Sequence, residues 1–243
     1  MQISVIIPTK NEAERLPATL EKVLSHLARQ NMEWELIVVD NGSQDGTDRM
    51  VEEQVSGNPR LKLLREMRPG KGAAIRKGML AAQGDIVVFS DADLSCPIEE
   101  EEKLRDALAK GYDIAIASRR LPESEVDRTP VRRVMSTLFN WVVQVLALPG
   151  IKDSQCGFKA FSREKARLLF GAGRIDGFAF DVELLFLARR MGWRIAEVPV
   201  RWHQSKGTRV DALSDAARMV RDILKLRWDW IRGKYRGRLG QSG

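Results

Sequence analysis

Short, β-branched apolar runs alternate with amphipathic stretches over the first half of the chain. The runs occupy residues 3–8, 35–40, 61–64, 85–93 and 112–120, and the one at 61–64 is the weakest. The stretches between them carry helix-start signals, such as Pro17 and the acidic run 99–102. Repeated strand–helix–strand units predict an α/β fold, in which helices cover both faces of a mostly parallel sheet.

The second half of the chain has a different pattern. Residues 121–130 are polar, and the segment 131–149 that follows is almost entirely apolar except for two arginines near its start. We expect helices at 177–192 and 211–232, separated by a short strand at 195–200. The helix at 211–232 is basic, with an apolar stripe of Leu213, Ala216, Ala217, Val220, Ile223, Leu224 and Ile231. The Gly-rich tail at 233–243 predicts disorder.

Composition narrows the class of protein. The 243 residues are 44% hydrophobic and 30% charged, which is ordinary for a globular chain with a sizeable core. The net charge of +7 favours anionic partners such as phosphorylated substrates, acidic lipid or nucleic acid. Two cysteines, Cys96 and Cys156, exclude a disulfide scaffold and a cysteine zinc site. Neither a signal peptide nor a membrane span is expected, and we predict a cytoplasmic protein.

Polar residues collect at the carboxyl ends of the predicted strands, where open α/β sheets bind their ligands. They are Asp40, Asp91, Asp93, Ser118 and Arg119. Asp91 and Asp93 form a D-x-D pair of hard oxygen ligands that suits Mg²⁺ or Mn²⁺ bridging a diphosphate. A lone D-x-D pair is often two solvated loop residues, and its position after a buried strand favours the metal interpretation here.

Two further positions suit a nucleotide. Asp40 can accept hydrogen bonds from a base or ribose, while Asp45 and Thr47 suit a helix-capping turn. Lys71 stands in a Gly-rich turn at a helix start, where backbone N–H groups and a lysine form an anion site. The G-x-x-x-x-G-K-[ST] pattern is absent, which disfavours GTPase-type chemistry.

Eight short motifs in this order resemble family 2 glycosyltransferases of GT-A fold. They are VIIPTKNEAERL, ELIVVDNGSQDGT, GKGAAIRKG, IVVFSDADLS, IAIASRR, DSQCGFKAF, FAFDVELL and EVPVRW, and the resemblance spans roughly residues 3–210. DSQCGFKAF with FAFDVELL is most similar to dolichyl-phosphate β-glucosyltransferases, and polyprenyl-phosphate mannose synthases come next. Two positions depart from common patterns: Asn41 stands where many members have a second acidic residue, and Ser95 where mannose synthases commonly have Gln.

The resemblance implies a role for each matching residue. Asp91 and Asp93 would bind the metal. The nucleotide-sugar would contact Pro8, Thr9, Glu12, Asp40, Lys71, Gly72, Asp91, Ala92 and Arg209, of which Arg209 reaches the diphosphate from a mobile loop. The acceptor phosphate would meet Arg119, Arg132 and Arg133, and Arg119 and Arg133 join the two aspartates as catalytic residues. Gln155, Asp181 and Glu183 are candidate sugar contacts, although the last two could equally be structural.

The implied reaction is hexosyl transfer from a nucleoside-diphosphate sugar to a polyprenyl or dolichyl phosphate. A lipid phosphate is already an anionic nucleophile, so it needs positioning by arginines more than a general base. In-line attack would invert the anomeric carbon and give a β-linked product, while the metal stabilises the leaving diphosphate. Glucose is the preferred sugar; mannose from GDP-mannose, or a glycan hydroxyl as acceptor, are the alternatives.

We predict that the chain has three parts. Residues 1–125 form the nucleotide-sugar-binding half, residues 126–210 the acceptor-binding half with an interfacial helix at 131–149, and residues 211–243 the amphipathic helix and flexible tail. The apolar helix at 131–149 and the basic amphipathic helix at 211–232 together favour peripheral binding to the cytoplasmic face of an anionic bilayer over a core or oligomeric role. Rival classes are a non-catalytic nucleotide-sugar binder and a basic nucleic-acid-binding protein, but no nucleic-acid recognition motif is present and we expect no such partner.

Overall fold

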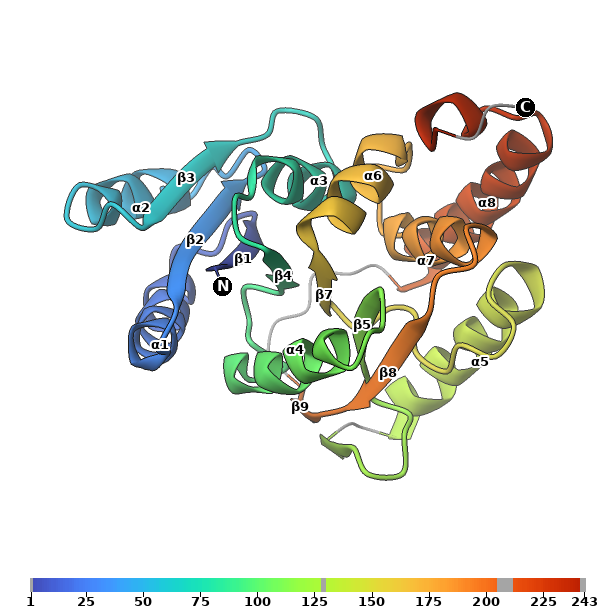
Figure 1. Cartoon of the computed structure of the whole chain (residues 1–243), viewed down its shortest axis with the longest axis horizontal. Coiled ribbons are helices and arrows are strands. Elements are labelled where there is room, and N and C mark those ends of the chain that lie inside the picture. The colour runs from blue at the N-terminus through green and yellow to red at the C-terminus, as the bar shows by residue number, and fades with distance from the viewer. Residues whose placement is uncertain (1, 128–129, 205–211, 241–243) are drawn as a thin grey trace.

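The computed structural model describes residues 2–127, 130–204 and 212–240, and its centre is one seven-stranded sheet (Figure 1). The strand order is β3-β2-β1-β4-β7-β5-β8. The strands are β1 (Gln2–Thr9), β2 (Glu33–Asp40), β3 (Leu61–Arg65), β4 (Ile86–Ser90), β5 (Ile114–Ser118), β7 (Phe158–Ser162) and β8 (Ile195–Pro199). A parallel two-stranded ribbon joins β6 (Glu125–Asp127) to β9 (Arg201–His203). The predicted α/β fold with a mostly parallel sheet is confirmed.

One strand of the main sheet runs against the others. β7 lies between β4 and β5 and is antiparallel to both, so Phe158 at its start pairs with Ser90 at the end of β4. The segment that precedes β7 therefore lies at the edge where the parallel strands end. The alternation of apolar runs did not anticipate this reversal, which brings residues 153–157 to the ligand-binding edge.

Helices cover both faces of the sheet (Figure 1). Side chains of β1 alternate between the two resulting cores. Ile6 joins the core under α3, α6 and α7, whereas Val5 and Ile7 join the core under α1 and α4. The helices are α1 (Leu16–Arg29), α2 (Thr47–Val55), α3 (Lys71–Ala81), α4 (Glu101–Ala109), α6 (Arg163–Ala172) and α7 (Phe180–Arg190). A 3₁₀ turn, η1 (Ile98–Glu100), leads directly into α4.

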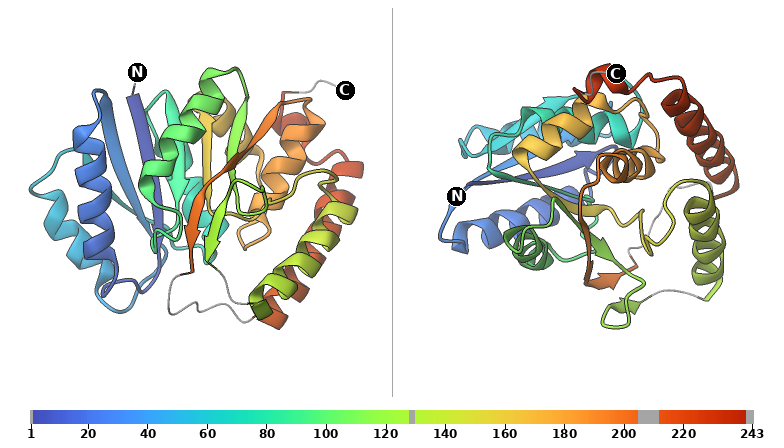
Figure 2. Two further views of the ribbon diagram at one scale, coloured as in Figure 1. Left: turned by 90° about the horizontal axis from the view of Figure 1, so that it is seen from below. Right: turned by 45° about the vertical axis from the view of Figure 1, so that its right-hand side comes forward.

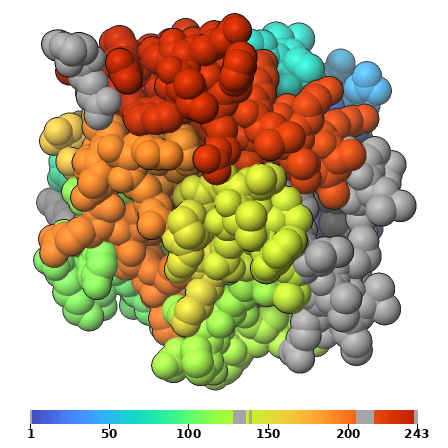
Figure 3. All heavy atoms as spheres, turned by 90° about the vertical axis from the view of Figure 1, so that its right-hand side faces the viewer, coloured from blue at the N-terminus to red at the C-terminus, as the bar shows by residue number. Residues whose placement is uncertain are grey.

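The two remaining helices, which are also the longest, lie side by side along one side of the molecule (Figures 2 and 3). They are α5 (Pro130–Leu146), within the apolar segment, and α8 (Ala212–Ile231), within the basic amphipathic segment. The Arg227 guanidinium of α8 donates a 2.5 Å hydrogen bond to the Leu146 carbonyl at the end of α5. Within the described ranges, no helix has the length and apolarity required for a membrane span.

The carboxy-terminal part corrects two expectations. The tail was expected to be disordered, but residues 233–240 fold back through a second 3₁₀ turn, η2 (Arg236–Arg238), and bury Tyr235 and Leu239. These two side chains bury apolar surface against the core, which the Gly-rich composition of the tail did not indicate. The predicted stripe of α8 is also displaced: Leu224 and Ile231 are exposed, while Met219 and Leu226 are buried beside Ile223, which was expected in the stripe. Residues 241–243 lie outside the described part.

Candidate active site

The site lies where β2, β4 and β5 end. Asp40 is the last residue of β2, Asp91 follows β4, and Arg119 follows β5. Because these strands are parallel or linked through β7, their ends meet at one edge of the sheet. Five strand-end residues were expected to converge, and their order in the sheet places them along this edge.

The D-x-D pair lies in a tight turn immediately after β4. The Asp91 carboxylate forms a 2.5 Å ion pair with the Lys71 ammonium, which comes from the first residue of α3. Burial opposes the charge on Lys71, but the neighbouring Asp91 and Asp181 carboxylates raise its pKa overall. The Asp93 carboxylate accepts the Ser95 backbone N–H at 2.9 Å, and Leu94 between them adopts φ +43°. The backbone N–H of Leu94 donates to the Asp91 carbonyl at 3.1 Å, which closes the turn.

The chemistry of this pair fits a hard divalent cation. Both carboxylates are partly exposed, and within the described residues no third acidic, His or Cys ligand is close enough to complete a three-residue cluster with them. Mg²⁺ is commonly held by one or two carboxylates together with substrate phosphates and water. A pair beside a lysine at a helix start is therefore suited to a metal that arrives with a diphosphate.

Gly157 makes room for Asp91. A Cβ at this position would collide with the Asp91 carboxylate, so a larger residue would require that carboxylate to leave its present position. The reversal of β7 and this glycine together bring the DSQCG segment against the D-x-D turn.

The Asp40 side chain is 4% exposed, and its two oxygens have different surroundings. Oδ2 accepts the backbone N–H groups of Gly42 and Ser43 at 3.0 and 3.1 Å. Oδ1 is buried and has no hydrogen-bond partner in the described structure. A buried acceptor without a partner costs free energy unless a ligand supplies a donor. Asp40 is thus held by its own loop with one oxygen available to an N–H or O–H group.

Asn41 has a different task from its neighbour. Its amide nitrogen donates to the Glu66 and Arg68 carbonyls at 2.9 and 2.8 Å, and its oxygen accepts the Gly70 N–H at 2.9 Å. One amide thereby holds three points of the turn that precedes Lys71. A second carboxylate at this position could not donate to the two carbonyls, which explains the departure from the acidic pattern in this chain.

The other residues predicted to contact the nucleotide-sugar lie near these loops. Pro8 and Thr9 end β1, and Thr9 pairs in register with Asp40. Glu12 forms a 3.1 Å ion pair with Arg15, and its backbone N–H donates to Thr47. Ala92 is buried between the two aspartates, and its carbonyl accepts a 2.7 Å hydrogen bond from Thr19 of α1.

Arg119 is held by a buried carboxylate that the sequence analysis did not identify. The guanidinium Nε and Nη2 donate to Asp153 Oδ2 and Oδ1 at 2.7 and 2.8 Å, and the Arg119 backbone N–H donates to Oδ2 at 2.9 Å. Burial alone would raise the pKa of Asp153, but the Arg119 charge and hydrogen bonds lower it to about 2. Asp153 is in turn positioned by Glu197, whose carboxylate accepts the Asp153 backbone N–H at 2.9 Å.

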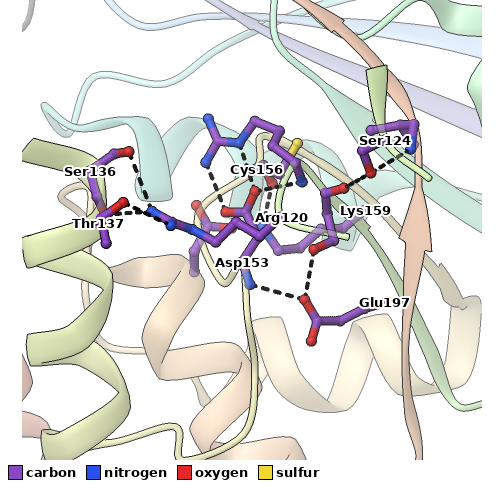
Figure 4. A network of polar contacts seen from close by, with 12 residues as sticks. Arg120, Ser124, Ser136, Thr137, Asp153, Cys156, Lys159 and Glu197 are labelled. Carbon is purple, nitrogen blue, oxygen red and sulfur yellow. Dashed lines mark hydrogen bonds and ion pairs between the residues drawn. The ribbon is translucent and has the colours of Figure 1, made fainter. Parts of the chain in front are cut away.

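Arg120 was not predicted as a site residue. Figure 4 shows it reaching from the loop after β5 to α5, where it donates to the Ser136 carbonyl at 2.6 Å and the Thr137 hydroxyl at 3.2 Å. Within the described residues these hydrogen-bond acceptors are neutral, and burial lowers the pKa of Arg120 more than the nearby Asp153 carboxylate raises it, with a further lowering by Arg119. The second arginine of the ASRR motif therefore has the less compensated positive charge.

A second buried ion pair lies deeper in the site. Lys159 of β7 contacts the Asp181 carboxylate of α7 at 2.6 Å and also donates to the Cys156 carbonyl at 2.6 Å. Burial raises the pKa of Asp181, and the positive charges of Lys159 and Lys71 partly offset that effect. The FDVEL carboxylate is thus neutralised from within the protein. No periodicity could have indicated this partner, because a lysine inside a strand motif reads as a surface residue.

The other candidate sugar contacts differ in position. Glu183 is fully buried and accepts the backbone N–H groups of Arg174 and Ile175 at 2.8 and 3.0 Å, together with the Tyr235 hydroxyl at 2.7 Å. These contacts favour the structural of its two suggested roles. Gln155 is half-buried, and its amide approaches the Met219 sulfur of α8.

Three predicted arginines cannot be compared with the expectation. Arg132 and Arg133 belong to the first turns of α5, and their side chains lie outside what the structure describes. Arg209 falls in the range 205–211, which is also outside it. Their contacts with phosphate remain predictions.

Comparison with known proteins agrees with this architecture. A solved structure of glucosyl-3-phosphoglycerate synthase from Mycobacterium tuberculosis, in complex with Mn²⁺, UDP-glucose and phosphoglyceric acid, matches with a TM-score of 0.71 at 25% identity. The match covers 100% of this chain and 81% of that one. The fold and the D-x-D edge thus define an α/β glycosyltransferase of the GT-A type.

The sequence comparisons are more specific. The model of glycosyl transferase family 2 matches residues 4–170, and the chain belongs to this family. The dolichyl-phosphate beta-glucosyltransferase of Dictyostelium discoideum is 36% identical over 95% of this chain and 75% of its own length. The human protein of the same name is 33% identical over 97% of this chain and 78% of its own length. The resemblance read from the eight motifs is confirmed.

Proposed function

We propose that this protein transfers glucose from UDP-glucose to a dolichyl or related polyprenyl phosphate and forms a β-linked lipid phosphosugar. The observation that carries the proposal is the similarity, over 95% and 97% of this chain, to two relatives named dolichyl-phosphate beta-glucosyltransferase. Because the similarity continues through the DSQCG loop and the FDVEL helix, it includes the acceptor-binding half as well as the nucleotide-binding half.

Asp40 supports the uridine part of the donor. Its unpartnered, buried Oδ1 is an acceptor, and uracil presents one N–H donor on its pairing edge. Pro8, Thr9 and Glu12 would flank the nucleoside from the end of β1. Lys71 and Gly72 at the start of α3 would receive the diphosphate, since helix N-termini favour negative charge.

Asp91 and Asp93 would hold the divalent metal, which supplies charge neutralisation for the leaving diphosphate when bound. The structural relative that binds UDP-glucose does so with Mn²⁺. In the described structure the Lys71 ammonium neutralises part of the negative charge of this pair through its contact with Asp91. The same ammonium can turn to a phosphate oxygen once a cation contacts the carboxylates.

The state of the buried carboxylates supports a phosphate as nucleophile. A hydroxyl acceptor needs a base that can receive a proton, but Asp181 is paired with Lys159 and Glu183 with two backbone amides and a tyrosine. A lipid phosphate arrives ionised and needs only positive charge and orientation. Arg120 would provide part of that charge beside Arg119, Arg132 and Arg133.

An exposed apolar surface supports contact with the membrane that contains such a lipid. Trp141 and Val145 on α5, with Leu224, Trp228 and Ile231 on α8, are each more than half exposed. We call these five residues the α5/α8 patch. Trp228 carries the Arg232 guanidinium over its ring at 4.6 Å, a combination that suits the boundary between acyl chains and acidic headgroups. The patch would hold the protein peripherally at the cytoplasmic face of the membrane.

The decisive experiment supplies purified protein with Mn²⁺, polyprenyl phosphate and one labelled donor at a time, including UDP-glucose and GDP-mannose. The expected result is a lipid-extractable product with UDP-glucose that mild acid hydrolyses to glucose. A matched reaction with unphosphorylated polyprenol should give none. Product from GDP-mannose alone would replace glucose by mannose, and transfer only to glycan hydroxyls would refute the lipid acceptor.

A further inference from the structure

We propose that Glu183 and Tyr235 are positioning residues for the donor diphosphate, because they hold the loop against which the Lys71 turn is seated. This inference rests on the proposed function, in which Lys71 receives the diphosphate. It gives the folded carboxy-terminal segment a task in donor binding, although Tyr235 lies beyond the stretch matched by the family model.

The Lys71 turn packs on the backbone of residues 175–176 without clearance. A Cβ at Gly70, whose φ is +127°, would collide with the Asp176 carbonyl. A Cβ at Gly72 would come within 2.8 Å of the Ile175 carbonyl and 2.7 Å of the Phe180 Cβ. The two glycines on either side of Lys71 therefore fit one surface, and a shift of that surface must move the turn or open a gap beneath it.

Direct bonds join the same two segments. The Ala73 N–H donates to the Asp176 carbonyl at 3.2 Å, and the Arg76 guanidinium donates to the Ile175 carbonyl at 2.8 Å and pairs with the Asp176 carboxylate. Helix α3 is thus fastened to residues 175–176 at its first and second turns. A displacement of residues 175–176 would therefore displace the start of α3 as well.

Glu183 fixes that loop from the other side. Its carboxylate accepts the N–H groups of Arg174 and Ile175, the residues directly before the contact with Gly70 and Gly72. It is fully buried at the first turns of α7, so its oxygens are satisfied by these bonds rather than by water. The carboxylate acts as a two-pronged holder of the loop backbone.

Tyr235 completes the coordination of Glu183. Its hydroxyl donates to Glu183 Oε1 at 2.7 Å, the same oxygen that accepts the Arg174 N–H. The tyrosine side chain is 1% exposed and its ring lies beside Trp230, so the hydroxyl has a defined direction. A continuous path of contacts runs from Tyr235 through Glu183 and the loop to the turn that carries Lys71.

The test compares Tyr235→Phe with the matched control Tyr112→Phe, which alters the only other tyrosine in the chain. Tyr235→Phe keeps the buried ring and removes one oxygen. We expect the KM for UDP-glucose and the Kd for UDP with Mn²⁺ to rise by about three- to tenfold, with the acceptor KM unchanged. A loss of folded protein would instead lower apparent kcat and leave both KM values in place. Tyr112→Phe should leave every parameter at the wild-type value.

Two additional measurements isolate the path. Hydrogen exchange of the Arg174 and Ile175 amides should accelerate in Tyr235→Phe, and again in Glu183→Gln where that variant folds. In a Lys71→Ala background, Tyr235→Phe should have almost no further effect on donor KM, because both changes act on one contact. An undiminished effect there, or an unchanged UDP Kd in Tyr235→Phe, overturns the inference. Wild-type protein that makes no lipid-linked glucose while UDP binding still responds to Tyr235→Phe would overturn the proposed acceptor instead.

Discussion

Asp153 binds Arg119 through both carboxylate oxygens and also accepts the Arg119 backbone N–H, with all three distances between 2.7 and 2.9 Å. Arg119, which the family resemblance would place near the reacting phosphates, is therefore largely neutralised by its own protein. A bidentate pair of this kind fixes the direction of the guanidinium and leaves one edge for a ligand. Under the proposed function, the pair would shape the acceptor side of the site and contribute little net charge.

Asp153→Asn should destabilise the protein in a pH-dependent way. The folded pKa of about 2 lies below the ordinary value of 3.8, so ionised Asp153 stabilises the fold above about pH 4 and that contribution is lost as pH falls toward 2. The difference corresponds to about 2 kcal/mol at pH 7. Urea unfolding of wild type and variant at pH 7, 4 and 2.5 should show the gap narrowing with acidity. A gap that stays constant with pH would contradict the assignment.

Arg120→Gln should weaken the acceptor and spare the donor. The side chain keeps hydrogen-bonding groups toward Ser136 and Thr137 but loses the positive charge available to a phosphate. We expect the KM for polyprenyl phosphate to rise about tenfold, the effect of a lost charge-assisted hydrogen bond, with the UDP-glucose KM near wild type. Arg105→Gln, on α4 and paired with Glu101, serves as the control for loss of a charge. Equal effects on both substrates would argue against an acceptor contact.

The sequence predicted the site best where chemistry follows strand ends. Asp40, Asp91 and Arg119 could be placed at one edge because parallel strands end together, and the D-x-D pair could be interpreted as a metal site because it follows a buried strand. Asp153 and Lys159 could not be found this way. They reach the site only because β7 runs antiparallel, and a reversal of one strand depends on long-range pairing rather than on local periodicity. Tyr235 was missed for a related reason, since its partner Glu183 is 52 residues away.

Asp91→Asn and Asp93→Asn should each lower kcat by about a hundredfold or more while the protein stays folded. Each change removes one anionic ligand that would help to hold the metal and, through it, stabilise the leaving diphosphate. Stability should change little for Asp93, whose side chain is partly exposed. The measurement is product formation over a Mn²⁺ titration, with the exposed Glu21→Gln of α1 as control. Turnover at the wild-type rate in either aspartate variant would refute the metal assignment.

Asp40→Ala should abolish recognition of the nucleoside. A nucleotide that binds only the folded state raises its melting temperature, and UDP with Mn²⁺ should do so for the wild type. Removal of Oδ1 takes away the acceptor for the base, and removal of Oδ2 frees the Gly42 and Ser43 N–H groups. The thermal shift by UDP should fall to near zero, whereas Asp45→Ala should lower the melting temperature without ligand yet keep a shift. A full UDP shift in Asp40→Ala would remove Asp40 from the donor site.

The α5/α8 patch should determine binding to lipid vesicles. Its five exposed apolar residues come from two helices that lie side by side (Figure 3). Transfer of one large side chain from water to an apolar phase is worth roughly 1.5–3 kcal/mol, which corresponds to about tenfold or more in vesicle affinity. Trp228→Ser and Trp141→Ser should each produce such a loss, and the double change should multiply the effects.

The control for this prediction is Leu80→Ser, at a 40% exposed apolar residue on α3. Sedimentation with vesicles of neutral and acidic lipid separates the two contributions, since salt should weaken the acidic-lipid increment and leave the tryptophan effect intact. Activity toward a water-soluble short-chain acceptor should survive both tryptophan changes, because neither residue lies at the D-x-D edge. If Leu80→Ser reduced vesicle binding as strongly as Trp228→Ser, the patch would have no special part in docking. The apolar side chains would then need another partner.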